Sequence, residues 1–157
     1  MVKLKKIIPY ILVVLLLALL ILGYALKDNL NKYISGEMQQ QTNPEIRLTI
    51  EEQIRSKYNY VENGEKYDFT FLEFGSTGCA SCKQMEPVLE EVRNSKKPRI
   101  NVVFMHIMKP ENLPWMKYYG ISAVPMQVLL DKQGNEFYRH YGFISAEELL
   151  NKLLSQK

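Results

Sequence analysis

An aromatic-rich segment leads directly into a closely spaced pair of cysteines in residues 69–82, FTFLEFGSTGCASC. The apolar run within Tyr67–Phe74 predicts a buried strand. Residues 75–78 contain two glycines and predict a loop. From Cys79 to about Asn94, apolar side chains recur at helical spacing and predict an amphipathic helix whose first residue is a cysteine.

Further elements are predicted on both sides of this segment, from capping boxes, apolar periodicity and turn residues. They are a short helix from the capping box Thr49–Glu52 to about Tyr58, a strand at Arg99–Ile107, a helix at Leu113–Tyr119, strands at Met126–Leu130 and Glu136–Tyr141, and a final helix opened by the capping box Ser145–Glu148. From residue 67 onward the order is strand, helix, strand, helix, strand, strand, helix. This alternation predicts an α/β fold in which helices cover the faces of one sheet.

The composition narrows the function. The chain has 157 residues and a formal net charge of +3. Three positive charges, Lys3, Lys5 and Lys6, precede an apolar segment, and the remainder is close to neutral, so no basic face indicates a nucleic-acid partner. The only two cysteines are three positions apart. A loop that short contributes little as a fold-stabilising disulfide, so the pair indicates chemistry.

The cysteine pair opens a predicted helix, which is typical of a redox motif. Unpaired N–H groups and partial positive charge at a helix N-terminus stabilise a thiolate, so a thiol at Cys79 is expected to have a pKa below about 8.5. Cys82 lies one turn later on the same face, within reach of an S–S bond. Two alternatives remain open, an inert buried pair and a zinc site. Zinc needs about four ligands, whereas the only histidines, His106 and His140, are single and lie in predicted strands.

An uncharged segment at residues 7–26 is long enough, as a helix, to cross the hydrocarbon core of a bilayer. We expect a signal-anchor, with residues 1–6 in the cytoplasm because lysines precede the segment. A cleaved signal peptide is the alternative, with a small-residue site at residues 23–25. Residues 27–44 are polar and predict a linker, which leaves residues 45–157 as one globular domain outside the cytoplasm.

Two motifs together resemble the thioredoxin superfamily. Phe69–Phe74, followed by Cys79-Ala80-Ser81-Cys82-Lys83 and Pro87, is similar to the active-site strand and helix of that family. Tyr119–Pro125 resembles the loop that ends in the family's cis-proline. The resemblance covers about residues 65–157 and implies a thioredoxin fold, preceded here by the predicted transmembrane helix.

The resemblance assigns a role to five residues. Cys79 is the exposed attacking thiol, and Cys82 is the buried resolving thiol. Glu73 stands where relatives carry a buried acid that relays the proton of Cys82, although the strand pattern alone also allows an outward-facing carboxylate. Pro125 is expected to be cis, with a trans proline opening the strand as the alternative. The backbone of Val124 is then free to bind a substrate strand.

The implied activity is protein thiol–disulfide exchange without a cofactor or metal, since the redox element is the cysteine pair itself. Neither residue between the cysteines is histidine, so a reductant of secreted or membrane proteins is expected. A transmembrane thiol carrier is the electron donor that the family implies. The alternatives are an oxidase or isomerase on the same fold and a redox-inactive peptide-binding module. The sequence departs from the family pattern at Gly78 and Met126, where relatives often carry tryptophan and threonine. The lysine that often neighbours the buried acid is also absent, with Phe104 or nearby residues in that region.

Overall fold

The computed structural model describes residues 2–156. They form two compact units, of which the first ends at Tyr33 and the second begins at Ile34. The first unit consists of the N-terminal part of helix α1 (Val2–Gln40). Its segment Ile8–Lys27 is long and apolar enough to cross a membrane, and its apolar side chains are exposed. The side chains of residues 1–6, the predicted cytoplasmic segment, lie outside the described part of the chain.

The second unit is built on one four-stranded sheet with strand order β2-β1-β3-β4. Strand β1 pairs in parallel with β2 and antiparallel with β3, and β3 and β4 form an antiparallel hairpin. Every residue of β1 is buried because the strand is central and both of its faces are covered. The strands are β1 (Phe69–Gly75), β2 (Ile100–His106), β3 (Met126–Leu130) and β4 (Glu136–Tyr141).

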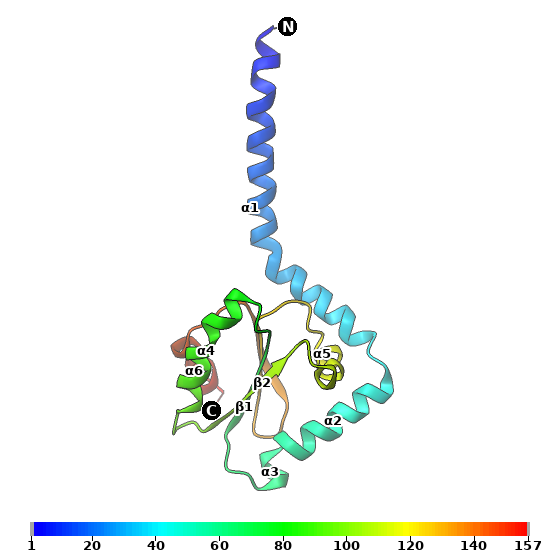
Figure 1. The fold of residues 1–157 in the computed structure, drawn as a ribbon, viewed down its shortest axis with the longest axis vertical. Coiled ribbons are helices and arrows are strands. Elements are labelled where there is room, and N and C mark those ends of the chain that lie inside the picture. The colour runs from blue at the N-terminus through cyan, green and yellow to red at the C-terminus, as the bar shows by residue number, and fades with distance from the viewer. Residues whose placement is uncertain (1, 157) are drawn as a thin grey trace. The chain divides into compact units, whose positions relative to one another are not determined.

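Helices cover both faces of this sheet. Helices α4 and α6 lie on one face, and α2 and α5 lie on the other (Figure 1). The short helix α3 and a 3₁₀ turn at Pro110–Asn112 complete the unit. The helices are α2 (Pro44–Tyr58), α3 (Tyr60–Asn63), α4 (Ala80–Arg93), α5 (Leu113–Tyr119) and α6 (Ala146–Leu154).

Alternation along the strands divides the core into two clusters. Phe71 of β1 and Leu129 of β3 pack with Met85 of α4 on one face. Leu72 and Phe74, the next positions along β1, belong to the cluster on the opposite face, which contains Trp115 of α5. Since side chains of a strand alternate between faces, any further odd-numbered residue of β1 or β3 lies on the α4 side.

The element order predicted from the sequence is confirmed. Helix α5 and strands β3 and β4 have the predicted bounds, and the Ser145 side chain caps α6 by accepting from the backbone N–H of Glu148. The strand predicted to end at Phe74 continues to Gly75. These local patterns succeed because periodicity, a capping serine and turn residues define each element independently of the rest of the fold.

The predicted start of the first domain helix is wrong. Thr49 does not cap the helix but lies within α2, where its hydroxyl donates to the backbone carbonyl of Glu45. The cap is Asn43, whose side-chain oxygen accepts from the backbone N–H of Glu45 at 2.8 Å, and Pro44 follows in the first turn. A proline at that position needs no hydrogen-bond partner and already has a helical φ, so the helix begins there.

The predicted linker over residues 27–44 also differs from the structure, since α1 continues to Gln40 and the second unit begins at Ile34. Ser35 is 1% exposed, donates to the carbonyl of Tyr119 at 3.3 Å and accepts from Arg139 at 2.8 Å. Thr42 is also buried and donates to the carbonyl of Lys117 at 2.8 Å. The second half of the expected linker is therefore part of the folded domain.

A chain beginning at residue 45 is expected to be less stable than one beginning at residue 34. The shorter chain lacks the hydrogen bonds of Ser35 and Thr42 and the Asn43 cap of α2, each worth about 1 kcal/mol, so the loss should be about 3 kcal/mol. Thermal unfolding of both chains measures the difference as a lower midpoint for the shorter one. Ser35→Ala in the longer chain should produce part of the loss, and the exposed Ser56→Ala should produce none. Coincident unfolding curves would contradict this account.

Candidate active site

The site begins where α4 starts. Cys79 is the residue that caps this helix, with an extended backbone at φ −92° and ψ 117°. Its sulfur accepts the backbone N–H of Cys82 at 3.2 Å, in place of the hydroxyl or carboxylate oxygen that usually fills this role. Ser81 places its hydroxyl 3.2 Å from the same sulfur. The N–H group and the hydroxyl both direct donor hydrogens at Cys79, which favours a sulfur that carries negative charge.

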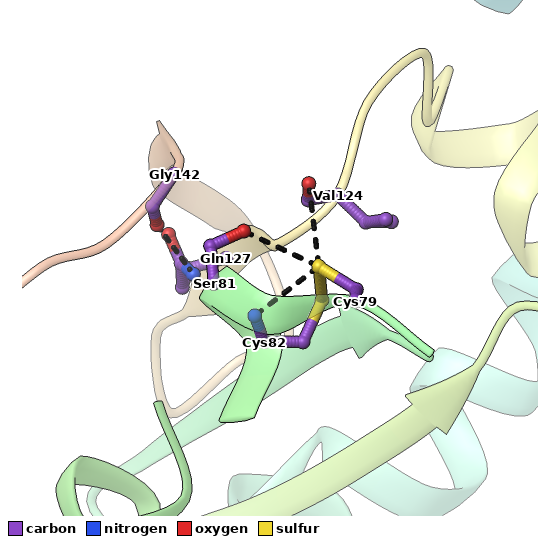
Figure 2. The surroundings of a disulfide bond; sticks show 6 residues. All are labelled: Cys79, Ser81, Cys82, Val124, Gln127 and Gly142. Carbon is purple, nitrogen blue, oxygen red and sulfur yellow. Dashed lines mark hydrogen bonds between the residues drawn. A yellow bond between two sulfur atoms is a disulfide. The ribbon is translucent and has the colours of Figure 1, made fainter. Parts of the chain in front are cut away.

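Cys79 and Cys82 form a disulfide with their Cα atoms 5.2 Å apart. Figure 2 shows this bond with Ser81 and Val124 beside Cys79. Cys79 is half-buried, whereas Cys82 is only 4% exposed. Cys79 is therefore the more accessible of the two cysteines, and their roles as attacking and resolving thiols stay predictions.

The loop before β3 faces the disulfide. The Val124–Pro125 peptide bond is cis, as the resemblance predicted, and the carbonyl oxygen of Val124 lies 4.0 Å from the sulfur of Cys79. Pro125 is buried, and its carbonyl accepts the backbone N–H of Gly142 at 2.8 Å. Gly142 has φ 90°, which only glycine adopts readily, so the bend after β4 holds the proline loop in place.

Glu73 is fully buried, and the outward-facing alternative is wrong. It lies two positions after Phe71 on the same strand and therefore on the α4 face of the sheet, the same face as the disulfide. Burial raises the pKa of its carboxyl from 4.5 to about 8, and the neighbouring Gln127 amide opposes part of this rise. Neither carboxyl oxygen has a hydrogen-bond partner among the described residues, so the amide lies beside the carboxyl without a formed bond to it.

Gly75 locates Cys82 relative to this carboxyl. A Cβ on Gly75 would lie 3.4 Å from the sulfur of Cys82 and 2.9 Å from the ring of Phe104. Gly75 and Glu73 are two positions apart on one strand face, a separation of about 6.6 Å. The sulfur of Cys82 thus lies over Gly75, on the same face of β1 as Glu73 and two residues along the strand from it. The absence of a side chain at Gly75 makes room for both the sulfur and the Phe104 ring.

Two expected departures have visible consequences. Phe104, in the strand position where relatives often carry lysine, is the β2 partner of Glu73 and is 42% exposed. The β2 position paired with Glu73 therefore carries an aromatic residue in place of a cation. Gly78 is exposed and has no atom within 4 Å of an added Cβ, so this side of Cys79 is open.

The histidines lie apart and have other contacts. The Nδ1 atom of His106 accepts the backbone N–H of Met108, and Nε2 of His140 lies 3.1 Å from the carbonyl of Phe143. Within residues 2–156, no group of three histidine, cysteine or acidic side chains comes together to hold a metal ion.

Sequence reasoning missed Gln127. This side chain is fully buried in β3, opposite Glu73 in the antiparallel register, and it lies on the same face. Its amide nitrogen donates to the carbonyl of Gly142 at 3.1 Å. A single polar residue inside the otherwise apolar run Met126–Leu130 was the available signal. The cis bond between Lys97 and Pro98 was also not predicted.

The class of protein is a thiol–disulfide oxidoreductase domain. It is defined by a cysteine that caps a helix, a second cysteine that is buried, a cis-proline loop and a buried carboxyl. Comparison with known proteins agrees. A family model described as a thioredoxin-like domain matches residues 54–157. The thioredoxin-like protein slr0233 of Synechocystis is 32% identical over 82 residues, 52% of this chain and 75% of that protein.

Two further comparisons define the extent of the likeness. The chloroplastic thioredoxin-like protein HCF164 of rice is 26% identical over 55% of this chain, which spans only 33% of that relative's length. A solved thioredoxin-like protein from Clostridium perfringens has a TM-score of 0.52 at 26% identity, over 60% of this chain and 75% of that one. The chain belongs to the thioredoxin-like domain family, and the fold expected from the sequence, the thioredoxin fold, is confirmed.

Replacement of Glu73 by glutamine is expected to stabilise the oxidised protein increasingly between pH 4.5 and pH 8. The folded state holds the carboxyl proton throughout this window because burial raises its pKa to about 8. The unfolded state has already released the proton, so the stability of the native sequence falls as the pH rises. Glutamine has no such proton, so the stability gap should widen by about 1.4 kcal/mol per pH unit, to several kcal/mol.

Urea unfolding across this pH range measures the gap between the Glu73→Gln variant and the native sequence. Glu91→Gln is the matched control, because Glu91 is exposed on α4 and its loss should leave no gap that grows with pH. A Glu73→Gln gap that stays constant or narrows as the pH rises would be the contradicting result.

Proposed function

We propose that this chain is a membrane-anchored protein thiol–disulfide oxidoreductase that reduces disulfides outside the cytoplasm. One observation carries the catalytic part of the proposal. A disulfide at the N-terminus of α4 joins a half-exposed sulfur, that of Cys79, to a buried one, that of Cys82. Val124 and the cis bond to Pro125 lie beside the accessible sulfur.

The reaction begins with the reduced pair. The Cys79 thiolate attacks one sulfur of a substrate disulfide, and the other substrate sulfur leaves as a thiolate and takes a proton from solvent. The substrate segment extends along the loop, where the backbone of Val124 pairs with it in the manner of an added strand. Pro125 has no N–H and keeps the loop in the shape that exposes this backbone.

The second step releases the substrate. Cys82 gives its proton to the Glu73 carboxylate as its sulfur attacks the sulfur of Cys79. The bond between Cys79 and the substrate breaks, the Cys79–Cys82 bond forms, and the second substrate sulfur departs reduced. The substrate gains two electrons and the protein loses two. The active pair is its own redox element, so the proposal needs neither a metal nor an organic cofactor.

The anchor is part of the proposal. The segment Ile8–Lys27 satisfies the length and apolarity of a membrane span, and lysines before it favour an N-terminus in the cytoplasm. The domain then lies on the other side of the membrane.

The direction of electron flow follows from the residues between the cysteines. Ala80 and Ser81 supply no cation to stabilise the reduced pair, so we place the potential nearer about −270 mV than about −120 mV. A dithiol partner must then re-reduce the pair, and a transmembrane thiol carrier is the donor that suits an external site. Equilibration with glutathione measures this potential. A value near about −120 mV would indicate that the protein is an oxidase and not a reductase.

Cys82→Ser in the full-length chain is expected to trap substrates as mixed disulfides through Cys79, because the resolving thiol is absent. Cys79→Ser is expected to trap none, since the remaining thiol is buried. Trapped adducts should stay in the membrane fraction after high-salt washing and should contain exported proteins. Non-reducing electrophoresis with mass spectrometry identifies them.

Three outcomes separate the parts of this proposal. Adducts formed by Cys79→Ser and not by Cys82→Ser would reverse the two cysteine roles. Adducts with cytoplasmic proteins alone would contradict the external location. Failure of both variants to form adducts, together with no insulin reduction by the native sequence, would contradict the enzyme itself.

A further inference from the structure

Three of the buried oxygens without a hydrogen-bond partner lie in one cross-strand pair. They are both carboxyl oxygens of Glu73 and the carbonyl oxygen Oε1 of Gln127. Both side chains are 0% exposed and lie opposite each other in the β1–β3 register. Among the described residues, only the hydroxyl of Ser122 shares this state. Buried polar groups normally find partners, so such a concentration indicates a functional arrangement.

The orientation of the Gln127 amide is fixed from its far side. Its Nε2 donates to the carbonyl of Gly142 at 3.1 Å, a contact that the oxygen end of the amide cannot make (Figure 2). Gly142 in turn donates its N–H to the carbonyl of Pro125. An amide nitrogen carries two hydrogens, and the bond to Gly142 uses one. The second hydrogen and the free Oε1 remain available to the carboxyl of Glu73.

The other neighbours of Glu73 leave this task to the amide. On β2 its partner is Phe104, which offers an aromatic ring. On the α4 side, the sulfur of Cys82 lies over Gly75, two positions from Glu73 on the same strand face. The next strand, β4, places His140 opposite Gln127, with its ring bonded to the carbonyl of Phe143. Within the part of the chain that the structure describes, burial raises the pKa of Glu73 and the Gln127 amide lowers it.

We infer that Gln127 is a positioning residue that lets Glu73 act as the proton acceptor, by donating its second amide hydrogen to the ionised carboxylate. The inference rests on the function proposed above. When the Cys82 proton arrives on Glu73, the new O–H donates to Oε1 of Gln127 instead. The amide therefore pairs with both forms of the carboxyl, and the bond to Gly142 keeps it in place during the exchange.

Gln127→Leu removes the amide at nearly constant volume and is expected to slow the resolving step. Without the donor, the ionised carboxylate is less stable, so the pKa of Glu73 should rise further above 4.5 than it does now. At pH 7 a smaller fraction of the protein then has a base ready for Cys82. We expect about a tenfold loss of the resolving rate at pH 7, with recovery at higher pH. The attack by Cys79 should not change.

The reagent 5,5′-dithiobis(2-nitrobenzoate) separates the two steps in the reduced full-length chain in detergent micelles. Attack by Cys79 releases one thionitrobenzoate and leaves the other bound, and attack by Cys82 releases the second. Stopped-flow absorbance follows both releases across pH. In Gln127→Leu, the second phase should slow. The acid limb of its pH–rate profile, where the rate falls as the pH falls, should move to higher pH by about one unit. An unchanged first phase shows that the variant is folded.

Three controls assign the effect. Gln133→Leu removes an exposed amide from the β3–β4 turn and should leave both phases unchanged. His140→Asn should leave the acid limb in place, since the limb belongs to Glu73. Glu73→Gln should abolish the limb, and adding Gln127→Leu to it should cause no further shift. If Gln127→Leu fails to fold, Gln127→Met replaces it.

Two results would overturn the inference while the proposed function stands. One is a limb that stays in place in Gln127→Leu, and the other is a limb that moves to lower pH, which would mean that the amide mainly serves the neutral carboxyl. A native chain that never releases the second thionitrobenzoate would instead overturn the proposed function, and the inference with it.

Discussion

The position of the α4 N-terminus relative to the end of β1 is the constraint on which the site depends. Three loop residues connect Gly75 to Cys79, and the helix begins at Ala80. Because the strand is buried on both faces and paired on both edges, its end is fixed within the sheet. The first turn of α4 is held there by Met85 and other apolar side chains that pack on Phe71. The capping sulfur is thus positioned by a helix that packs directly on the core.

This placement gives the two cysteines different environments within one helical turn. Cys79, at the cap, meets donor hydrogens and the open side of the molecule, whereas Cys82 lies over Gly75 and is buried. A buried thiol needs a nearby acceptor to lose its proton, because water cannot reach it freely. Burial raises the pKa of the Glu73 carboxyl to about 8, and a pKa near the working pH is the property that a reversible proton acceptor requires.

Much of the fold could be predicted from sequence because its signals are local. The apolar run of β3, the turn residues before β4, the serine cap of α6 and the Gly120 end of α5 each define an element without reference to the others. The family resemblance supplied the cysteine roles and the cis-proline. Contacts between distant segments could not be inferred in this way. Ser35 bonds a residue 84 positions away, so its polar sequence context resembled a linker. Gln127 acquires meaning only from the register that places it opposite Glu73.

The central claim is that the α4 cap makes Cys79 the reactive thiol of the pair. A brief pulse of iodoacetamide on the reduced full-length chain at neutral pH, followed by peptide mapping, tests it directly. Both cysteines fall in one short segment, and fragmentation of that peptide assigns the label to either position. The account predicts modification of Cys79 well before Cys82, because Cys79 is accessible and its thiolate is stabilised by the helix N-terminus. Equal labelling, or labelling of Cys82 first, would contradict it.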